Sequence, residues 1–170
     1  MKIFLIGFMG SGKTTAGKKL AYSLSYNYLD LDEFIEQQEQ DSIRNIFEKK
    51  GERYFREQEH EYLRKISGYD DCVISTGGGA PCFFDNMDYM NKAGLTVYLK
   101  MEPGQLVSRL KDGKEERPLI KDKDDQELLQ FIKDKLNERD KHYAKAHLIV
   151  DGFNLNLKEL LDKIRAFLKQ

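Results

Sequence analysis

The chain has 170 residues, of which 34% are charged, and its formal net charge is -1 at pH 7. This length favours one domain, spanning 1–170, with a sizeable core, and the balanced charge gives no global basic bias toward nucleic acid. No stretch has the apolar length of a membrane span, so we expect a soluble, monomeric protein whose partners are neither nucleic acids nor membranes.

The first expected strand, 2–7, runs into the stretch IGFMGSGKTT, and a helix is expected over 13–25. The spacing Gly7-x-x-x-x-Gly12-Lys13-Thr14 is that of a phosphate-binding loop. Its glycines let backbone N–H groups point at phosphate oxygens, and the helix presents its positive end to the same phosphates. Lys13 would reach the β- and γ-phosphates, and the Thr14 hydroxyl would bind Mg²⁺. The alternative is a plain Gly/Ser-rich turn, but a chance match to four fixed positions has a probability of about 1%. The candidate nucleotide-binding residues are Gly10, Ser11, Gly12, Lys13, Thr14 and Thr15.

The second expected strand, 26–31, ends in the acidic triplet Asp30-Leu31-Asp32. Side chains alternate along a strand, so we expect the two carboxylates on one side of the sheet. Near a phosphate-binding loop they suit Mg²⁺, directly or through water, and a hydrogen bond to an acceptor hydroxyl. The alternative is a strand-end turn in which one acid caps the next helix.

Helices are then expected over 33–40, from Ser42 up to a break at Gly51, and over 52–66, followed by a buried strand at 73–76. Arg56 lies in the third of these helices, and most helical arginines are solvated surface residues. The strand leads into Gly77, Gly78 and Gly79. Three ordered glycines cost backbone entropy, and their expected use is close approach to a ligand, with a flexible turn as the alternative.

The remaining elements continue the alternation, with helices at 85–92, 103–110, 124–144 and 156–168 and strands at 95–100 and 147–150. This order predicts an α/β three-layer sandwich, in which a five-stranded parallel sheet is covered by helices on both faces. Ligands would bind beyond the carboxyl ends of the strands. Between 111 and 125 a charged stretch carries Arg117, as in a lid that closes over transferring phosphate. The two cysteines, Cys72 and Cys82, lack disulfide-framework and zinc-site spacing, so we expect a reducing, cytoplasmic setting with Cys72 packed in a strand.

Together these motifs resemble those of the shikimate kinase family, in the family's order and over essentially the whole chain. The matching stretches are 7–15, Asp30-Leu31-Asp32, Gly51-Glu52-x-x-Phe55-Arg56-x-x-Glu59, Thr76-Gly77-Gly78-Gly79, Arg117-Pro118-Leu119 and Arg139-x-x-x-Tyr143. The resemblance implies a P-loop kinase fold like that of nucleoside monophosphate kinases, with a substrate-binding region at about 32–60 and a lid at about 111–125. The implied reaction moves the γ-phosphoryl group of ATP to the 3-hydroxyl of shikimate.

The resemblance also implies roles for individual residues. Asp32 would contact the substrate hydroxyls, with Lys13 and Arg117 acting on the phosphates. Arg56, oriented by Glu59, and Arg139 would hold the substrate carboxylate, and the backbone of Gly77, Gly78 and Gly79 would approach the ring. Thr14 would bind Mg²⁺ directly and Asp30 through water, and Arg109 would pack on the adenine.

The chain departs from the family in two places. The region between Arg109 and Arg117 is slightly longer than in some relatives, and the segment after the last strand, 151–156, lacks an arginine that some members place near the adenine. The rival interpretations are another small-metabolite kinase of the same architecture, for gluconate or a nucleotide, and a non-catalytic ATP-binding module that regulates a partner.

Overall fold

The computed structural model describes residues 1–111, 120–167 and 169, and its centre is one parallel β-sheet. The strands are β1 (Lys2–Ile6), β2 (Asn27–Asp30), β3 (Cys72–Ser75), β4 (Leu95–Lys100) and β5 (Leu148–Asp151). They lie in the order β2-β3-β1-β4-β5, and every neighbouring pair is parallel. The predicted five-stranded parallel sheet is confirmed, and the strand that precedes the phosphate-binding loop lies at its centre.

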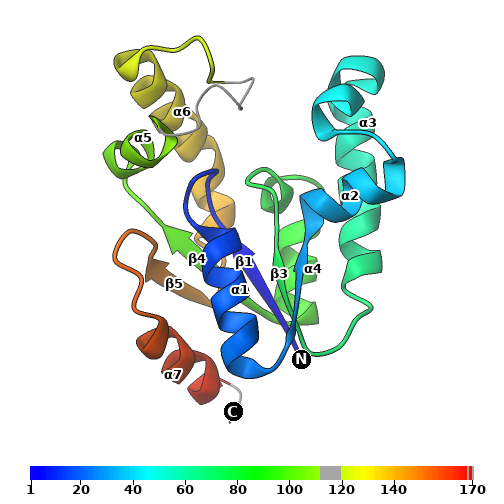
Figure 1. The fold of residues 1–170 in the computed structure, drawn as a ribbon, viewed down its shortest axis with the longest axis vertical. Coiled ribbons are helices and arrows are strands. Elements are labelled where there is room, and N and C mark those ends of the chain that lie inside the picture. Colours follow the sequence, from blue (N-terminus) through cyan, green and yellow to red (C-terminus); the bar gives the residue numbers. More distant parts are fainter. Residues whose placement is uncertain (112–119, 168, 170) are drawn as a thin grey trace.

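Seven α-helices and one short 3₁₀ helix are present in the described part of the chain (Figure 1). They are α1 (Lys13–Leu24), α2 (Leu31–Glu39), α3 (Ile43–Ile66), η1 (Ala80–Cys82), α4 (Asn86–Ala93), α5 (Pro103–Lys111), α6 (Asp125–Tyr143) and α7 (Leu157–Phe167). Their starts follow local sequence. Ser42 accepts a hydrogen bond from the Asn45 N–H at the start of α3, and Asp124 forms a capping box with Glu127 at the start of α6. The predicted break at Gly51 is a kink within α3.

Two separate cores lie on the two faces of the sheet, because side chains alternate along each strand. In β1, Ile3 and Leu5 face the core under α1 and α7, whereas Phe4 and Ile6 face the core that contains residues of α3, α4 and α6. Cys72 is fully buried in β3, as predicted. The three-layer arrangement is therefore confirmed, and the carboxyl ends of the strands are left between two helical regions.

One predicted boundary is wrong, and it matters for the site. The strand expected over 26–31 ends one residue early, because β2 ends at Asp30 and α2 begins at Leu31, so the alternative of an acid that caps the next helix is correct. Asp30 Oδ1 accepts hydrogen bonds from the N–H groups of Asp32 and Glu33, at 3.0 and 3.4 Å. Asp30 is thus the N-cap of α2, and strand alternation cannot be the reason that the two acids lie near each other.

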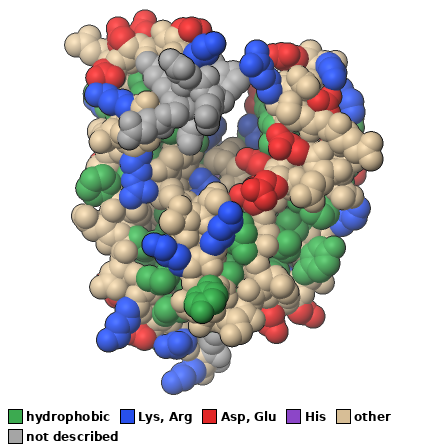
Figure 2. All heavy atoms as spheres, in the orientation of Figure 1, with side chains coloured by type: hydrophobic (Ala, Val, Ile, Leu, Met, Phe, Trp, Pro, Cys, Tyr) green, Lys and Arg blue, Asp and Glu red, His purple; other side chains and the backbone are tan. Residues whose placement is uncertain are grey.

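The carboxyl edge of the sheet opens between the α2–α3 side and the α5–α6 side of the molecule (Figure 1). Figure 2 shows the surface hollowed there, with acidic and basic side chains along the walls. In the part of the chain that the structure describes, no helix is long and apolar enough to cross a membrane.

Candidate active site

The loop between β1 and α1 has the local structure of an anion-binding site. Gly12, at the N-cap of α1, has a φ of 88°, and the helix has neither a side-chain cap nor an acidic residue in its first turn. The positive end of α1 is therefore not neutralised by the chain itself, which favours an external anion. Lys13 Nζ lies inside the loop, donating to the carbonyl oxygens of Gly7 and Phe8 at 2.9 and 2.8 Å.

A cavity of about 250 Å³ lies beside this loop, on the side of β5. Its lining residues are Ser11, Gly12, Thr15, Ala16, Lys19, Arg109, Gly152, Phe153, Leu155 and Leu157. Arg109 spans it, since a Cβ atom on Gly12 would lie 2.9 Å from Arg109 Nη1, and Arg109 Nη2 donates to the carbonyl oxygens of Gly152 and Phe153 at 3.3 Å each. The cavity therefore has a cationic side chain, Arg109, and an aromatic one, Phe153, in its wall. The Phe153 ring centroid lies 5.7 Å from Arg109 Cζ.

The acids after β2 lie near the loop but in different environments. Asp30 combines its cap bonds with a third interaction, because Tyr28 Oη donates to Asp30 Oδ2 at 3.1 Å. Burial raises the pKa of Tyr28 to about 12, with Asp30 adding to the shift. Asp32 lies in the first turn of α2, and burial together with Asp30 raises its pKa to about 6, while Lys13 and Arg56 oppose the shift. At pH 7 the Asp32 side chain is therefore mainly ionised.

The three glycines after β3 are each packed against a different polar group. A Cβ atom on Gly77 would lie 2.9 Å from Asp32 Oδ1, and one on Gly78 would lie 3.1 Å from Arg139 Nη1. A Cβ atom on Gly79 would lie 2.6 and 2.7 Å from the two terminal nitrogens of Arg56. Any larger residue would displace these groups, so close approach, rather than flexibility, explains the triple glycine. The turn brings Asp32, Arg56 and Arg139 to one place.

Arg56 is held in α3 by an acid and by aromatic rings. Its Nη1 donates to Glu59 Oε2 at 2.8 Å, and its Cζ lies 4.2 Å from the Phe83 ring centroid. Glu59 is fully buried, and its Oε1 has no hydrogen-bond partner among the described residues. Burial raises the pKa of Glu59 to about 7, against the effect of Arg56. The predicted i,i+3 pairing of Glu59 with Arg56 is present, and it orients the guanidinium plane.

Arg139 is held on the opposite wall, from α6. Its Cζ lies 5.3 Å from the Phe8 ring centroid. One helical turn later, the fully buried Tyr143 donates its hydroxyl to the carbonyl oxygen of Gly78. Tyr143 thus connects the helix that carries Arg139 to the glycine turn.

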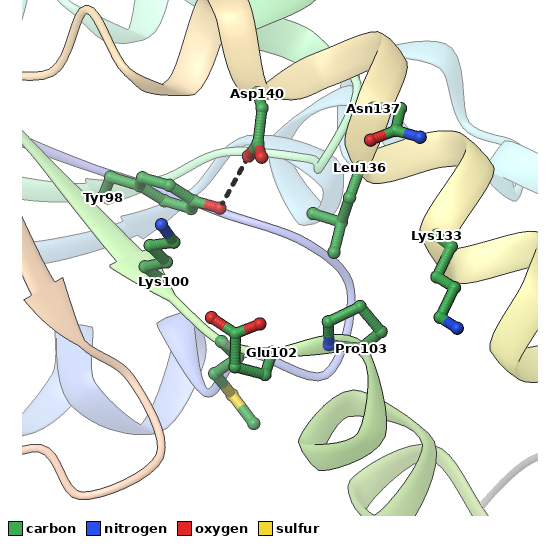
Figure 3. A pocket seen from close by; sticks show the side chains of 9 residues that line it. Tyr98, Lys100, Glu102, Pro103, Lys133, Leu136, Asn137 and Asp140 are labelled. Carbon is green, nitrogen blue, oxygen red and sulfur yellow. Dashed lines mark hydrogen bonds between the residues drawn. The ribbon is translucent and has the colours of Figure 1, made fainter.

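A further cavity, of about 320 Å³, lies between β4 with the residues that follow it and α6 (Figure 3). It is lined by Tyr98, Lys100, Met101, Glu102, Pro103, Lys133, Leu136, Asn137 and Asp140. Tyr98 Oη donates to Asp140 Oδ1 at 3.3 Å, and the Tyr98 ring lies 4.8 Å from that of Tyr143. The Tyr98 ring therefore packs against the Tyr143 ring.

A family model described as shikimate kinase matches residues 9–169 of the chain. A shikimate kinase from Phocaeicola vulgatus is 49% identical over 145 residues, which cover 85% of this chain and 83% of that protein. The chain belongs to the shikimate kinase family. A crystal structure of the shikimate kinase from Bacteroides thetaiotaomicron has a TM-score of 0.92 at 38% identity, covering 100% of this chain and 99% of that one. The structure from Acinetobacter baumannii, solved in complex with shikimate, has a TM-score of 0.84 at 32% identity, with coverage of 99% and 92%.

As a member of the shikimate kinase family the protein is a kinase, and its predicted site residues gather in two adjacent groups. Gly10 to Thr15 belong to the phosphate-binding loop and the start of α1, and Arg109 lines the cavity beside them. Asp32, Arg56, Glu59 and Arg139 gather at the glycine turn. Arg117 lies outside the described residues, as does most of the predicted lid.

Two tyrosines of the site received no role from the sequence. Tyr143 follows Arg139 at the i,i+4 spacing that places both on one helix face, which was an available signal. For Tyr28 the sequence offers no such signal, except that Tyr28 lies two residues before Asp30.

Proposed function

We propose that this member of the shikimate kinase family transfers the γ-phosphoryl group of ATP to the 3-hydroxyl of shikimate. The observation that carries the proposal is the convergence of Asp32, Arg56 and Arg139 on the glycine turn beside the phosphate-binding loop. Shikimate is a small ring with one carboxylate and three hydroxyls. Two guanidinium groups suit the carboxylate, while an ionised aspartate and exposed backbone suit the hydroxyls.

The nucleotide would bind across the loop and the cavity beside it. Its phosphates would lie against Gly10 to Thr15, where the uncapped start of α1 and Lys13 supply positive charge. Its adenine would lie against Arg109 and Phe153, which line the cavity of about 250 Å³. Phe153 thereby offers a ring in the segment that lacks the arginine of some family members.

The residues present also fit magnesium shared with the nucleotide. No group of three or more His, Cys, Asp or Glu side chains among the described residues could hold a metal ion alone, so phosphate oxygens would complete the ligand set. Thr14 would bind the ion and Asp30 would act through water. Bound there, Mg²⁺ neutralises charge on the β- and γ-phosphates.

The chain's own residues then perform three tasks. Arg56 and Arg139 fix the carboxylate and so the position of the ring. Asp32, ionised at pH 7, accepts a hydrogen bond from the attacking hydroxyl and orients it. Its role is orientation more than proton removal, because a loose transition state needs little help from a base. Lys13, with Arg117 from the lid at about 111–125, stabilises the charge on the transferred group. Closure of the lid over the substrate region at about 32–60 excludes water.

The decisive experiment is a coupled ADP-release assay with ATP and Mg²⁺, comparing shikimate with gluconate and with nucleoside monophosphates. Turnover with shikimate alone is the expected result. Turnover only with another acceptor would keep the phosphate-binding loop and refute the roles of Arg56 and Arg139. ATP binding without any turnover would favour a regulatory module.

In the active protein, Arg139→Ala should raise the KM for shikimate far more than the KM for ATP. An equal rise in both KM values would show that Arg56 and Arg139, the proposed carboxylate clamp, do not hold the shikimate carboxylate.

A further inference from the structure

Tyr28 occupies a junction between the phosphate-binding loop and the acids that follow β2. It is the second residue of β2, and its ring lies over the N-terminal half of α1, with Lys18 Nζ 5.6 Å from the ring centroid. Its hydroxyl donates to Asp30 Oδ2 at 3.1 Å, and the Thr14 and Ser75 hydroxyls are near enough to act on it by hydrogen bonding. One side chain therefore bonds to Asp30 and packs against the helix that carries Thr14, the two residues that are proposed to act on magnesium.

Gly17 makes room for this ring. A Cβ atom on Gly17 would lie 2.5 Å from Tyr28 Cε2 and 3.0 Å from Ser75 Oγ. Gly17 lies inside α1, where glycine is less favourable than alanine by roughly 0.5–1 kcal/mol. Thr14 and Gly17 are three residues apart and so share a helix face. The absence of a side chain at Gly17 thus lets the ring pack on α1 while its hydroxyl reaches Asp30.

The hydroxyl of Tyr28 completes the restraint on the Asp30 carboxylate. Oδ1 is held by the first N–H groups of α2, and Oδ2 accepts only from Tyr28 among the hydrogen bonds of the described residues. Without this donor, the Asp30 carboxylate could rotate about its terminal side-chain torsion, which has a broad energy minimum in aspartate. The lone pairs that remain on Oδ2 would then no longer point in one direction.

We propose that Tyr28 is a positioning residue for magnesium, which orients Asp30 through its hydroxyl and packs against the helix that presents Thr14. The inference rests on the proposed function, in which Thr14 and Asp30 serve the metal of the nucleotide. Groups that hydrogen-bond to metal-binding side chains typically contribute 10–100-fold in metal affinity. We expect the lower end of that range, because Asp30 would act through water.

The test is the affinity of the enzyme–ADP complex for Mn²⁺, measured by electron paramagnetic resonance of the free ion. Tyr28→Phe keeps the ring and removes only the hydroxyl, and it should weaken Mn²⁺ binding by about tenfold. Binding of ADP in EDTA and the thermal unfolding midpoint should stay at wild-type values. Tyr22→Phe is the matched control, because Tyr22 lies on α1 and is 89% exposed. Gly17→Ala, which would push the ring aside, should weaken Mn²⁺ binding in the same way.

Asp30→Asn distinguishes an error in the role of Tyr28 from an error in the proposed metal role of Asp30. If Asp30→Asn weakens Mn²⁺ binding while Tyr28→Phe does not, the role of Tyr28 is wrong and the metal role of Asp30 stands. If neither variant changes Mn²⁺ binding, the metal role of Asp30 is itself wrong. If Tyr28→Phe weakens metal-free ADP binding by the same factor, Tyr28 is a packing residue and the inference is refuted.

Discussion

Gly79→Ala should impair shikimate binding through a steric effect of one methyl group. The φ and ψ angles of Gly79 are -84° and -21°, a right-handed conformation that alanine adopts without strain. The added Cβ would lie 2.6 Å from Arg56 Nη2, whereas ordinary contact begins near 3.4 Å. The guanidinium group must therefore move by about 0.8 Å, the difference between these two distances.

This displacement would misalign the hydrogen bonds that Arg56 makes with the substrate carboxylate. Hydrogen bonds to charged groups contribute roughly 1.5–3 kcal/mol, which corresponds to a rise in the KM for shikimate of about 10-fold to 150-fold. The KM for ATP should stay unchanged, because the nucleotide contacts do not include Arg56. The fold should survive, since the atoms that move are the end of a flexible side chain, and the unfolding midpoint should shift by only about 2–4 °C.

The assay is steady-state ADP release, with shikimate and ATP varied in turn, alongside thermal unfolding. Gly104→Ala is the matched control, because nothing lies within 4 Å of a Cβ atom at that position, and it should behave like the wild type. An unchanged KM for shikimate in Gly79→Ala would show that Arg56 does not contact the substrate. A large loss of stability would show that the turn cannot accommodate the methyl group, and the steric reasoning would then be wrong.

Three further predictions concern charge, pH and the support of the glycine turn. Lys13→Ala should lower kcat by about 10²-fold or more, as expected when an electrostatic stabiliser is lost, and a variant with full kcat would exclude Lys13 from the mechanism. The value of kcat/KM for shikimate should fall as pH drops through about 6, because Asp32, whose raised pKa is about 6, must be ionised to accept the hydroxyl; a profile flat down to pH 5 would contradict this. Tyr143→Phe leaves the part-buried Gly78 carbonyl without its donor. A cost of roughly 1 kcal/mol, the lower end of the range for an unsatisfied acceptor, should appear in the unfolding free energy by urea titration and as a higher KM for shikimate.

Features that depend on adjacent residues were predictable from the sequence. The phosphate-binding loop is one contiguous motif between a strand and a helix, and its glycines and lysine have roles that depend on local backbone geometry. The alternation of strands and helices predicted the parallel sheet, since parallel strands need crossover connections. The capping residues Ser42 and Asp124 also act locally, so the helix starts they mark could be recognised.

The start of α2 was harder to predict, because aspartate is both a strand-end residue and a helix cap. Asp30 accepts from the N–H groups two and three residues later, and that choice moves Asp32 from a strand into a helix. Local propensity is a weak guide that tertiary context often overrides, so it does not separate the two arrangements at Asp30. Both acids do lie near the loop, but the reason is that Asp30 caps α2 and Asp32 lies in its first turn, not that the two side chains alternate along a strand.

The clamp and the tyrosine contacts were decided by the tertiary structure. Apart from the family motifs in which they stand, Arg56 and Arg139 look like solvated helical arginines, and only the position of the turn after β3 brings them beside Gly79 and Gly78. The contact of Tyr28 with Gly17 likewise joins a strand to a helix across the sheet face. Local sequence patterns are enough to predict a phosphate-binding loop in a parallel α/β fold. Which distant side chains face that loop depended on strand order and packing, because such contacts join residues that no local pattern relates.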